Sequence, residues 1–204
     1  MNAGYPIMLR LEGKIVVVIG GGKVAERKAG TLLGTGASIS VVSPEATAAI
    51  KGWSLEGRIV WKQKSFSAED LQDAFMIFAA TDVKEINQSI KAMAGQHQLV
   101  TVADNPEASD FYLPSHFQRG RMSIAVSTGG ASPILAREIR EQLERQFGEE
   151  YEDYLDFLYS KRQWILKWVK DSSLKRKLLT AIASEEFLTS SEREADFQRL
   201  LERR

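Results

Sequence analysis

Residues 14–28, KIVVVIGGGKVAERK, restrict the fold of this chain more than any other stretch. Five consecutive β-branched residues occupy positions 15–19, and a strand of this composition suits burial on both faces. Three glycines follow at once, and a sequence of helical character follows the glycines. A strand joined to a helix by a glycine turn is typical of a parallel sheet, so we expect an α/β fold.

The glycine turn matches the dinucleotide-binding pattern G-x-G-x-x-G/A at Gly20, Gly22 and Ala25. The first position allows a tight turn, the second lets the backbone approach a pyrophosphate, and the third lets helix and strand pack closely. The next helix directs its free N–H groups at the phosphates. We therefore take Gly20, Gly22, Lys23 and Val24 as cofactor-binding candidates. The alternative is a glycine-rich turn in an ordinary strand–helix unit.

The end of the second expected strand, residues 38–42, indicates which dinucleotide would bind. An Asp or Glu about 20 residues past the fingerprint normally holds the adenosine ribose of NAD. This chain has Ser43, Pro44 and Glu45 there, and no arginine stands beside them to hold a 2′-phosphate. We take all three as cofactor-binding candidates and favour NAD over NADP. Plain turn chemistry is the alternative for Ser43 and Pro44.

Strand and helix alternate through the first half of the chain, which indicates a parallel sheet with right-handed crossovers. Further strands are expected at residues 58–62, 75–80 and 99–103, and a helix at 83–94. Ligands of such sheets bind beyond the carboxyl ends of the strands, where Thr81, Asp82 and Asp104 fall. We take Thr81 and Asp82 as cofactor-binding candidates. We also expect Asp82 to cap its helix, and we consider Asp104 the better candidate for a catalytic residue.

Composition excludes several classes of function. Lys plus Arg and Asp plus Glu both number 27, so no global field draws the chain to nucleic acid or to an anionic membrane. The absence of cysteine rules out disulfides, thiolate metal sites and thiol nucleophiles, and we expect no metal site. The longest apolar runs are too short to span a bilayer and no leader sequence is evident, so we expect a cytoplasmic protein.

The last third of the chain changes character. From residue 147 on, aromatic and leucine side chains recur at helical spacing and predict an all-helical unit. We expect its aromatic side chains in a core or subunit interface rather than around a cofactor. The preceding loop, residues 127–133, leads into a helix with Ser132 as N-cap and Pro133 at the first position. That loop is either an anion site or an ordinary capped helix start.

Four segments, in this order and spacing, resemble the precorrin-2 dehydrogenase family, the NAD-dependent enzymes of sirohaem synthesis. They are VIGGGKVAERK at 18–28, AATD at 79–82 with Asn87, Asp104 with SDF at 109–111, and STGGASP at 127–133 with Ala136 and Arg137. The resemblance implies a Rossmann-type NAD-binding domain at 1–112, a dimerisation region at 113–147 and a helical C-terminal domain at 148–204. It also implies a homodimer whose subunits build the sites jointly.

The reaction implied by this resemblance is the oxidation of precorrin-2 by NAD to sirohydrochlorin and NADH, in the synthesis of sirohaem or cobalamin. Asp104 matches the family's key aspartate and is our candidate to remove or orient the proton that is lost. Some members also insert ferrous iron into the product, and there Asp104 and His116 would serve, although a lone histidine is often structural. We expect a dehydrogenase only. The alternatives are a bifunctional chelatase for Fe²⁺ or Co²⁺ and a non-catalytic NAD-sensing module.

Precorrin-2 is a polycarboxylate, so a neutral protein needs a local basic wall to bind it. Arg119, Arg121 and Arg137 lie in the matched region and are our candidates, with a solvated helix face as the alternative for Arg137. Thr128 occupies a position that is a phosphorylated serine in some multifunctional members, and we place it on the substrate side. Thr101 stands where the family commonly has an asparagine.

Overall fold

The computed structural model describes residues 4–202 and divides into two compact units, with the boundary between Leu113 and Pro114. Each unit is described here by itself. The boundary expected after residue 112 lies one residue away. The further division expected after residue 147 falls inside the second unit and stays a prediction.

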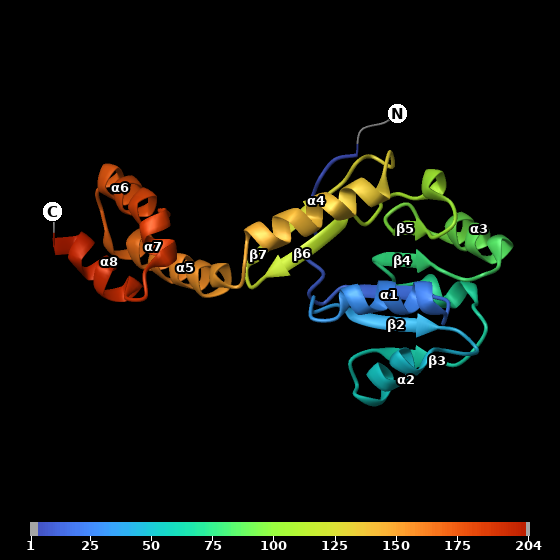
Figure 1. The fold of residues 1–204 in the computed structure, drawn as a ribbon. Coiled ribbons are helices and arrows are strands. Elements are labelled where there is room, and N and C mark those ends of the chain that lie inside the picture. Colours follow the sequence, from blue (N-terminus) through green and yellow to red (C-terminus); the bar gives the residue numbers. More distant parts are fainter. Residues whose placement is uncertain (1–3, 203–204) are drawn as a thin grey trace. The chain divides into compact units, whose positions relative to one another are not determined.

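The first unit is built on a five-stranded parallel sheet in the order β3-β2-β1-β4-β5 (Figure 1). Its strands are β1 (Ile15–Ile19), β2 (Ser38–Val42), β3 (Val60–Lys62), β4 (Met76–Ala79) and β5 (Leu99–Val102). Its helices are α1 (Lys23–Leu32), α2 (Ala48–Leu55) and α3 (Lys84–Met93), with short 3₁₀ turns η1 (Ala68–Leu71) and η2 (Pro106–Ala108). The strand order reverses between β1 and β4, which confirms the Rossmann-type sheet and puts the ligand crevice at the carboxyl ends of these strands.

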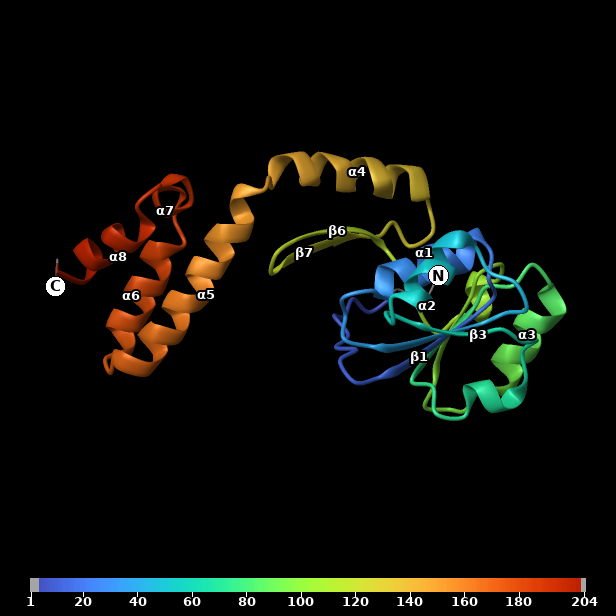
Figure 2. The same cartoon turned by 90° about the horizontal axis from the view of Figure 1, so that it is seen from below.

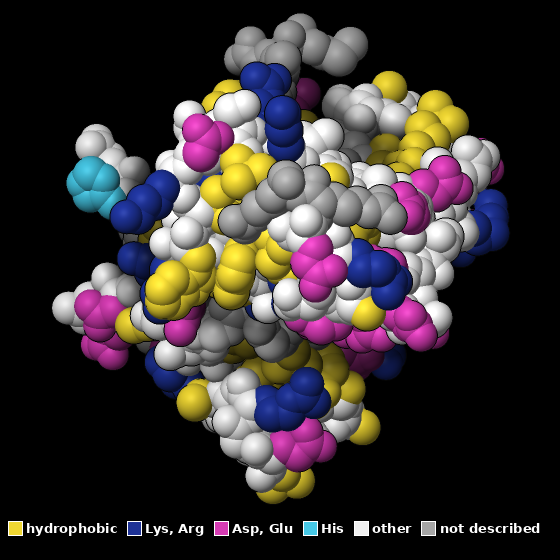
Figure 3. All heavy atoms as spheres, turned by 90° about the vertical axis from the view of Figure 1, so that its left-hand side faces the viewer, with side chains coloured by type: hydrophobic (Ala, Val, Ile, Leu, Met, Phe, Trp, Pro, Cys, Tyr) yellow, Lys and Arg dark blue, Asp and Glu magenta, His cyan; other side chains and the backbone are white. Residues whose placement is uncertain are grey.

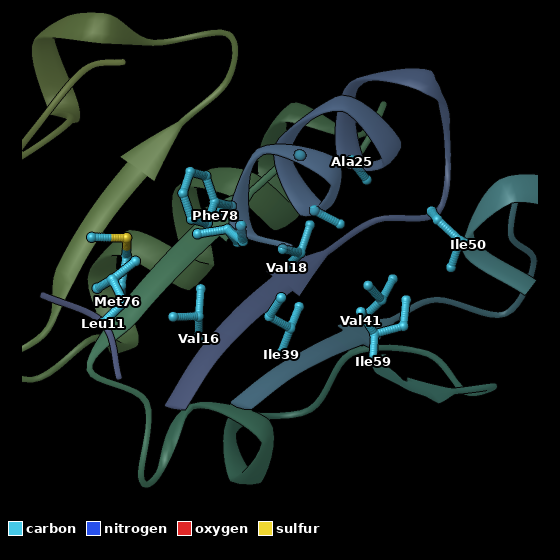
Figure 4. Close-up of a cluster of buried hydrophobic side chains, with 13 residues drawn as sticks. Leu11, Val16, Val18, Ala25, Ile39, Val41, Ile50, Ile59, Met76 and Phe78 are labelled. Carbon is cyan, nitrogen blue, oxygen red and sulfur yellow. The ribbon is translucent and has the colours of Figure 1, made fainter. Parts of the chain in front are cut away.

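Alternate residues of the central strands β1 and β4 face two separate hydrophobic layers. Val16 and Val18 of β1 pack in the layer under α1 and α2, which Figure 4 shows together with Ala25. Val17 and Ile19 pack in the opposite layer, which η1 and α3 cover. Figures 1 and 2 show these helices on both faces of the sheet. The four β1 residues are at most 2% exposed, so the expectation of a strand buried on both faces is confirmed for them.

Helix α2 was not predicted from the sequence. It carries Gly52 in its interior, which lowers helix propensity, and Ile50 is its one fully buried residue. Its apolar periodicity is therefore weak. Thr47 begins the helix, because its side chain accepts a hydrogen bond from the Ile50 N–H over 3.4 Å.

The second unit begins with an antiparallel hairpin, on which the next helix packs. Its elements are β6 (Ser115–Arg119), β7 (Met122–Val126), α4 (Pro133–Gln146), α5 (Glu150–Trp168), α6 (Ser172–Ile182), α7 (Glu185–Thr189) and α8 (Arg193–Glu202). Strand β6 was also not predicted, because only Phe117 among its five residues is buried. The expected start of α4 is confirmed: Ser132 accepts from the Leu135 N–H over 3.1 Å and Pro133 is the first helical residue.

Helices α5 to α8 share one hydrophobic core, as the helical spacing predicted. Its buried residues are Tyr154, Ile165, Val169, Leu178, Ile182, Phe187 and Phe197. Phe157 stacks on Phe187 with ring centroids 5.9 Å apart, so these aromatic side chains are core residues. On the face drawn in Figure 3, hydrophobic, basic and acidic side chains are interspersed. Across residues 4–202, we find no helix with the length and apolar character that a membrane span requires.

Candidate active site

The turn between β1 and α1 fits closely between the ends of two neighbouring strands. The N–H of Gly20 donates to the carbonyl of Val42, at the end of β2, over 3.0 Å. Gly20 has a φ of 126°, and a Cβ atom added to it would overlap the carbonyl oxygen of Ala80, just after β4. A Cβ atom on Gly21 would overlap the carbonyl oxygen of Glu45, just after β2. Only glycine fits at both positions without a shift of the backbone.

Gly22 serves a different purpose from these two glycines. It is the N-cap of α1, its backbone is extended, and no side chain caps the helix there. A Cβ atom on Gly22 would meet no atom within 4 Å. Lys23 and Val24, the first two residues of α1, are exposed, so their N–H groups are open to a ligand. A pyrophosphate fits this cradle, since it needs both the open backbone and the helix N-terminus.

The charges beside this turn are balanced within the protein. Lys23 Nζ lies 3.0 Å from a Glu26 carboxylate oxygen. Hydrogen bonds from Thr47 and then from Lys23 lower the pKa of the Glu26 carboxyl, so this carboxylate stays charged and neutralises the lysine. Attraction for a phosphate at this turn must then come chiefly from the backbone N–H groups of α1.

The three candidates after β2 differ in accessibility. Ser43 is buried, and its hydroxyl and carbonyl oxygens both accept from the Trp61 indole N–H, over 3.2 and 3.1 Å. Pro44 and Glu45 are exposed. The Glu45 carboxylate is therefore better placed than Ser43 to meet a ribose hydroxyl, and Ser43 holds the end of β2 against β3.

The loop after β4 is organised by Thr81 and Asn87. The Thr81 N–H donates to Asn87 Oδ1 over 3.1 Å, and Asn87 Nδ2 donates back to the Thr81 carbonyl over 3.0 Å. The Thr81 hydroxyl accepts from the N–H of Val83, the N-cap residue of α3, which no side chain caps. The expectation that Asp82 caps this helix is wrong, because the helix begins one residue later and Thr81 turns the chain into it. Asp82 is exposed.

Asp104 stands after β5 as an exposed carboxylate held at one oxygen. Its Oδ1 accepts from Asn87 Nδ2 over 3.0 Å. The loop that carries it is fixed by neighbours: Asn105 Oδ1 accepts from the Ala108 N–H, and the Ser109 hydroxyl lies 3.0 Å from the Asn105 carbonyl oxygen. Asn87 thus joins the loop after β4 directly to the candidate catalytic aspartate.

The Ser-Asp-Phe segment at 109–111 completes the open edge of the sheet. Ser109 Oγ accepts from the Val102 N–H over 2.9 Å, and Asp110 Oδ2 accepts from the Val100 N–H over 2.8 Å. These side chains satisfy the outer N–H groups of the edge strand β5. The ring of Phe111 packs edge-on against the core residue Phe78, with ring centroids 5.6 Å apart. The segment therefore holds the Asp104 loop in place.

The candidates His116, Arg119 and Arg121 lie on the β6–β7 hairpin of the second unit. His116 is exposed, and its Nδ1 is 3.3 Å from the Pro114 carbonyl oxygen. Arg119 lies 3.6 Å from a Glu144 carboxylate of α4. Arg121 is paired at 2.6 Å with a carboxylate of α5 and lies over a tyrosine ring of the same helix. The joint action of His116 with Asp104 stays a prediction.

The two remaining candidates lie around the start of α4. Arg137 is exposed and pairs with Glu141 over 2.8 Å, a hydrogen bond that raises the pKa of the guanidinium and lowers that of the carboxyl. The Thr128 hydroxyl accepts from the Ser132 N–H over 3.1 Å and lies 3.0 Å from the Ser132 carbonyl oxygen. Thr128 thereby closes the loop before α4.

Three family models match successive parts of the chain. Residues 7–115 match a putative NAD(P)-binding domain, 119–146 the central domain of sirohaem biosynthesis proteins, and 151–197 the SirC C-terminal domain. The precorrin-2 dehydrogenase of Priestia megaterium is 36% identical over 98% of each chain. A solved structure of SirC, precorrin-2 dehydrogenase, is 36% identical, has a TM-score of 0.84, and is matched over 98% of this chain and 100% of its own. The chain belongs to the precorrin-2 dehydrogenase family.

A sirohaem synthase of Nitrosococcus oceani is also similar, with 35% identity over 94% of this chain but only 42% of its own length. Membership in the precorrin-2 dehydrogenase family agrees with the resemblance drawn from the four sequence segments. Within residues 4–202, no three His, Asp or Glu side chains are grouped closely enough to hold a metal ion.

The sequence did not reveal the roles of Gly21 and Asn87 in this candidate site. Gly21 occupies a variable position of the fingerprint, and the signal for its role was the third consecutive glycine. Asn87 is an amide on the inward face of α3, one turn before the buried Ile90. A polar residue at an inward helical position was the available signal, because such a group needs partners inside the fold.

Proposed function

We propose that this protein oxidises precorrin-2 to sirohydrochlorin and transfers the two electrons to NAD. Relatives that share its whole length carry the name precorrin-2 dehydrogenase. The observation that carries the proposal is the meeting of two features at one sheet edge. The open turn at Gly22 accommodates a pyrophosphate, and Asp104 presents a carboxylate fixed through Asn87 to the loop after β4.

The residues of the first unit fit NAD. Bound NAD supplies nicotinamide C4 as the acceptor of a hydride. The backbone at Gly22, Lys23 and Val24 would hold the pyrophosphate, Gly20 allows the tight turn before it, and Glu45 beside Pro44 would meet the adenosine ribose. Residues 43–47 carry no basic side chain to hold a 2′-phosphate, which favours NAD over NADP. Thr81 and Asp82, after β4, border the nicotinamide side of the same crevice.

Asp104 is the residue that we assign to the proton. Oxidation of the macrocycle removes a hydride and a proton, and the proton needs an acceptor or a group that orients the C–H or N–H bond. Asp104 Oδ1 is engaged by Asn87, whereas no partner contacts Oδ2 among the described residues. We therefore propose that Oδ2 acts on the substrate while Oδ1 fixes the carboxylate.

The second unit supplies the substrate side and the dimer contact in this proposal. Arg119, Arg121 and Arg137 are our candidates for the substrate carboxylates, with Thr128 shaping the adjacent loop. Each arginine now pairs with a carboxylate of the protein, so the substrate would exchange those partners. We propose that residues 113–147 form the interface of a homodimer, because α4 exposes large apolar side chains at its start, namely Ile134 and Leu135. We also propose a cytoplasmic location.

The test is an anaerobic incubation of the purified protein with precorrin-2 and NAD. NADH absorbance and the sirohydrochlorin spectrum are followed for wild type, Asp104→Ala and Asp104→Asn, and NAD affinity is measured by calorimetry. We expect turnover with NAD and little with NADP, and a loss of about 10²–10⁴ in kcat for both variants with unchanged NAD affinity.

Two other outcomes would point elsewhere. If the wild type binds NAD but does not oxidise precorrin-2, the proposed dehydrogenase activity is contradicted. The result would then favour the non-catalytic NAD-sensing module. If both Asp104 variants still oxidise precorrin-2, the protein is a dehydrogenase but Asp104 takes no part in the reaction. A further incubation of sirohydrochlorin with Fe²⁺ or Co²⁺ tests the chelatase alternative.

A further inference from the structure

Asn87 is the most deeply buried polar side chain that the structure describes, at 1% exposure. It lies in the first half of α3, on the buried side of the helix with Ile90. Burial of a primary amide is unfavourable unless its hydrogen-bonding groups find partners. The partners that Asn87 does find are drawn from the two loops that flank the candidate active site.

The four hydrogen-bonding positions of the Asn87 amide are all occupied. Oδ1 accepts from the Thr81 N–H over 3.1 Å and from the Thr81 hydroxyl over 2.8 Å. Nδ2 donates to the Thr81 carbonyl and to Asp104 Oδ1, each over 3.0 Å. Because the Thr81 N–H can only donate, it determines which way the amide faces. The Nδ2 group is therefore the one directed at Asp104.

We propose that Asn87 is a positioning residue for the oxidation of precorrin-2, one that fixes the Asp104 carboxylate relative to the loop after β4. This inference rests on the proposed function. An amide donor can hold only an oxygen that accepts, so Asn87 commits Oδ1 to the protein and leaves Oδ2 for the substrate. The same amide holds Thr81, so the aspartate and the nicotinamide side of the crevice keep one spacing. Asn87 itself touches no reacting atom in this arrangement.

A structural role alone would give different results. Removal of Asn87 lowers the melting temperature under either role, because it leaves the Thr81 backbone groups without their partner. If Asn87 only tied the loop after β4 to α3, its removal would also weaken NAD binding, and any loss in kcat would be independent of Asp104. A positioning role predicts instead a loss in kcat that depends on Asp104, because the two residues then act as one unit.

The first experiment is a double-mutant cycle with Asn87→Ala and Asp104→Ala in the anaerobic precorrin-2 assay, with melting temperatures measured for each. Gln88→Ala, the exposed neighbouring amide on α3, is the matched control. We expect Asn87→Ala to lower kcat by about 10- to 100-fold with KM and NAD affinity within about threefold. In the Asp104→Ala background, the Asn87→Ala substitution should lower kcat by less than about twofold further. Additive losses in the double variant would overturn the inference.

The second variant, Asn87→Asp, keeps the shape of the side chain and its acceptor for the Thr81 N–H. It places a carboxylate against Asp104 Oδ1, and two carboxylates in contact hold a proton between them. We expect its pH–rate profile to be displaced to higher pH relative to wild type, and a profile that coincides with wild type would overturn the inference. Absence of turnover by the wild type would overturn the proposed function and this inference together, whereas wild-type turnover with either contrary result overturns the inference alone.

Discussion

Gly20 approaches Ala80 so closely that a Cβ atom on the glycine would overlap the alanine carbonyl oxygen. This contact joins the ends of β1 and β4, the two strands between which the strand order reverses. Gly22, two residues on, has open space where its Cβ would lie. The first glycine is therefore required by the fold, and the second is left open for a ligand.

Alanine substitutions separate these two requirements. We expect Gly20→Ala to destabilise the protein by about 3 kcal/mol or more, because it adds backbone strain to a steric overlap. Gly22→Ala should leave the urea midpoint nearly unchanged and weaken NAD binding about tenfold, equivalent to about 1.4 kcal/mol. Urea unfolding and calorimetric titration with NAD measure the two effects. If a folded Gly22→Ala protein binds NAD with unchanged affinity, the pyrophosphate does not bind at this turn.

The sequence predicted those parts of the fold in which local pattern and tertiary packing agree. The bounds of β1 and β2 are correct: β1 is a run of β-branched residues that suits burial on both faces, and β2 buries Ile39, Val41 and Val42. Helix α2 was missed because Gly52 and a single fully buried residue give it little helical signal. Strand β6 was missed because Ser-His-Phe-Gln-Arg shows no clear apolar alternation. In both elements, contacts with distant residues decide the structure.

The same limit applies to the candidate site. Strand ends can be assigned from sequence, so Gly20, Thr81 and Asp104 were correctly expected at one edge of the sheet. Their hydrogen-bond partners depend on side-chain directions that no spacing rule supplies. The expected cap at Asp82 was wrong for this reason, since Thr81 and Asn87 were able to satisfy the same loop. The four hydrogen bonds that Asn87 makes with Thr81 and Asp104 were likewise visible only in three dimensions.

Asp70 should make the stability of the first unit depend on pH. Burial alone would raise the pKa of this carboxyl, but hydrogen bonds from Lys64, from the Ser67 N–H and from Lys62 outweigh it and lower the pKa. A folded-state pKa below the unfolded value of about 3.9 stabilises the protein above that value. The stabilisation is lost as the pH falls through the folded-state pKa.

We therefore expect Asp70→Asn to lower the free energy of unfolding by about 1–2 kcal/mol at pH 7, a value reduced by the solvent exposure of both lysines. The difference from wild type should narrow as the pH falls below about 4, because protonation of Asp70 removes the same charge. Urea unfolding at pH 7 and pH 3 measures this difference in the free energy of unfolding. The control is Asp73→Asn, a substitution of an exposed aspartate. A difference that is the same at both pH values would contradict the assignment.

Arg121 should couple the β6–β7 hairpin to α5. Its Nε lies 2.6 Å from Asp156 Oδ1, and its guanidinium carbon lies 3.8 Å from the centre of the Tyr159 ring. Both charged side chains are at least half exposed, so solvent screens the pair and the coupling is small. A double-mutant cycle of Arg121→Ala with Asp156→Ala should give about 0.5 kcal/mol, and one with Tyr159→Leu about 0.5–1 kcal/mol. Zero coupling in both cycles would show that the contact contributes nothing in solution.

Tyr154 should contribute to the stability of the helical core through its hydroxyl group. The ring is buried, and the hydroxyl donates to the Ile182 carbonyl over 2.9 Å, with the Ser184 carbonyl 3.2 Å away. Burial raises the pKa of this tyrosine, so the hydroxyl keeps its proton and remains a donor. Tyr154→Phe keeps the ring but removes the donor at the end of α6, and we expect it to cost about 1–2 kcal/mol. Thermal unfolding followed by circular dichroism measures this, with the half-exposed Tyr159→Phe as the control. If the two variants melt at the same temperature, the buried hydroxyl does not hold α6 against α5.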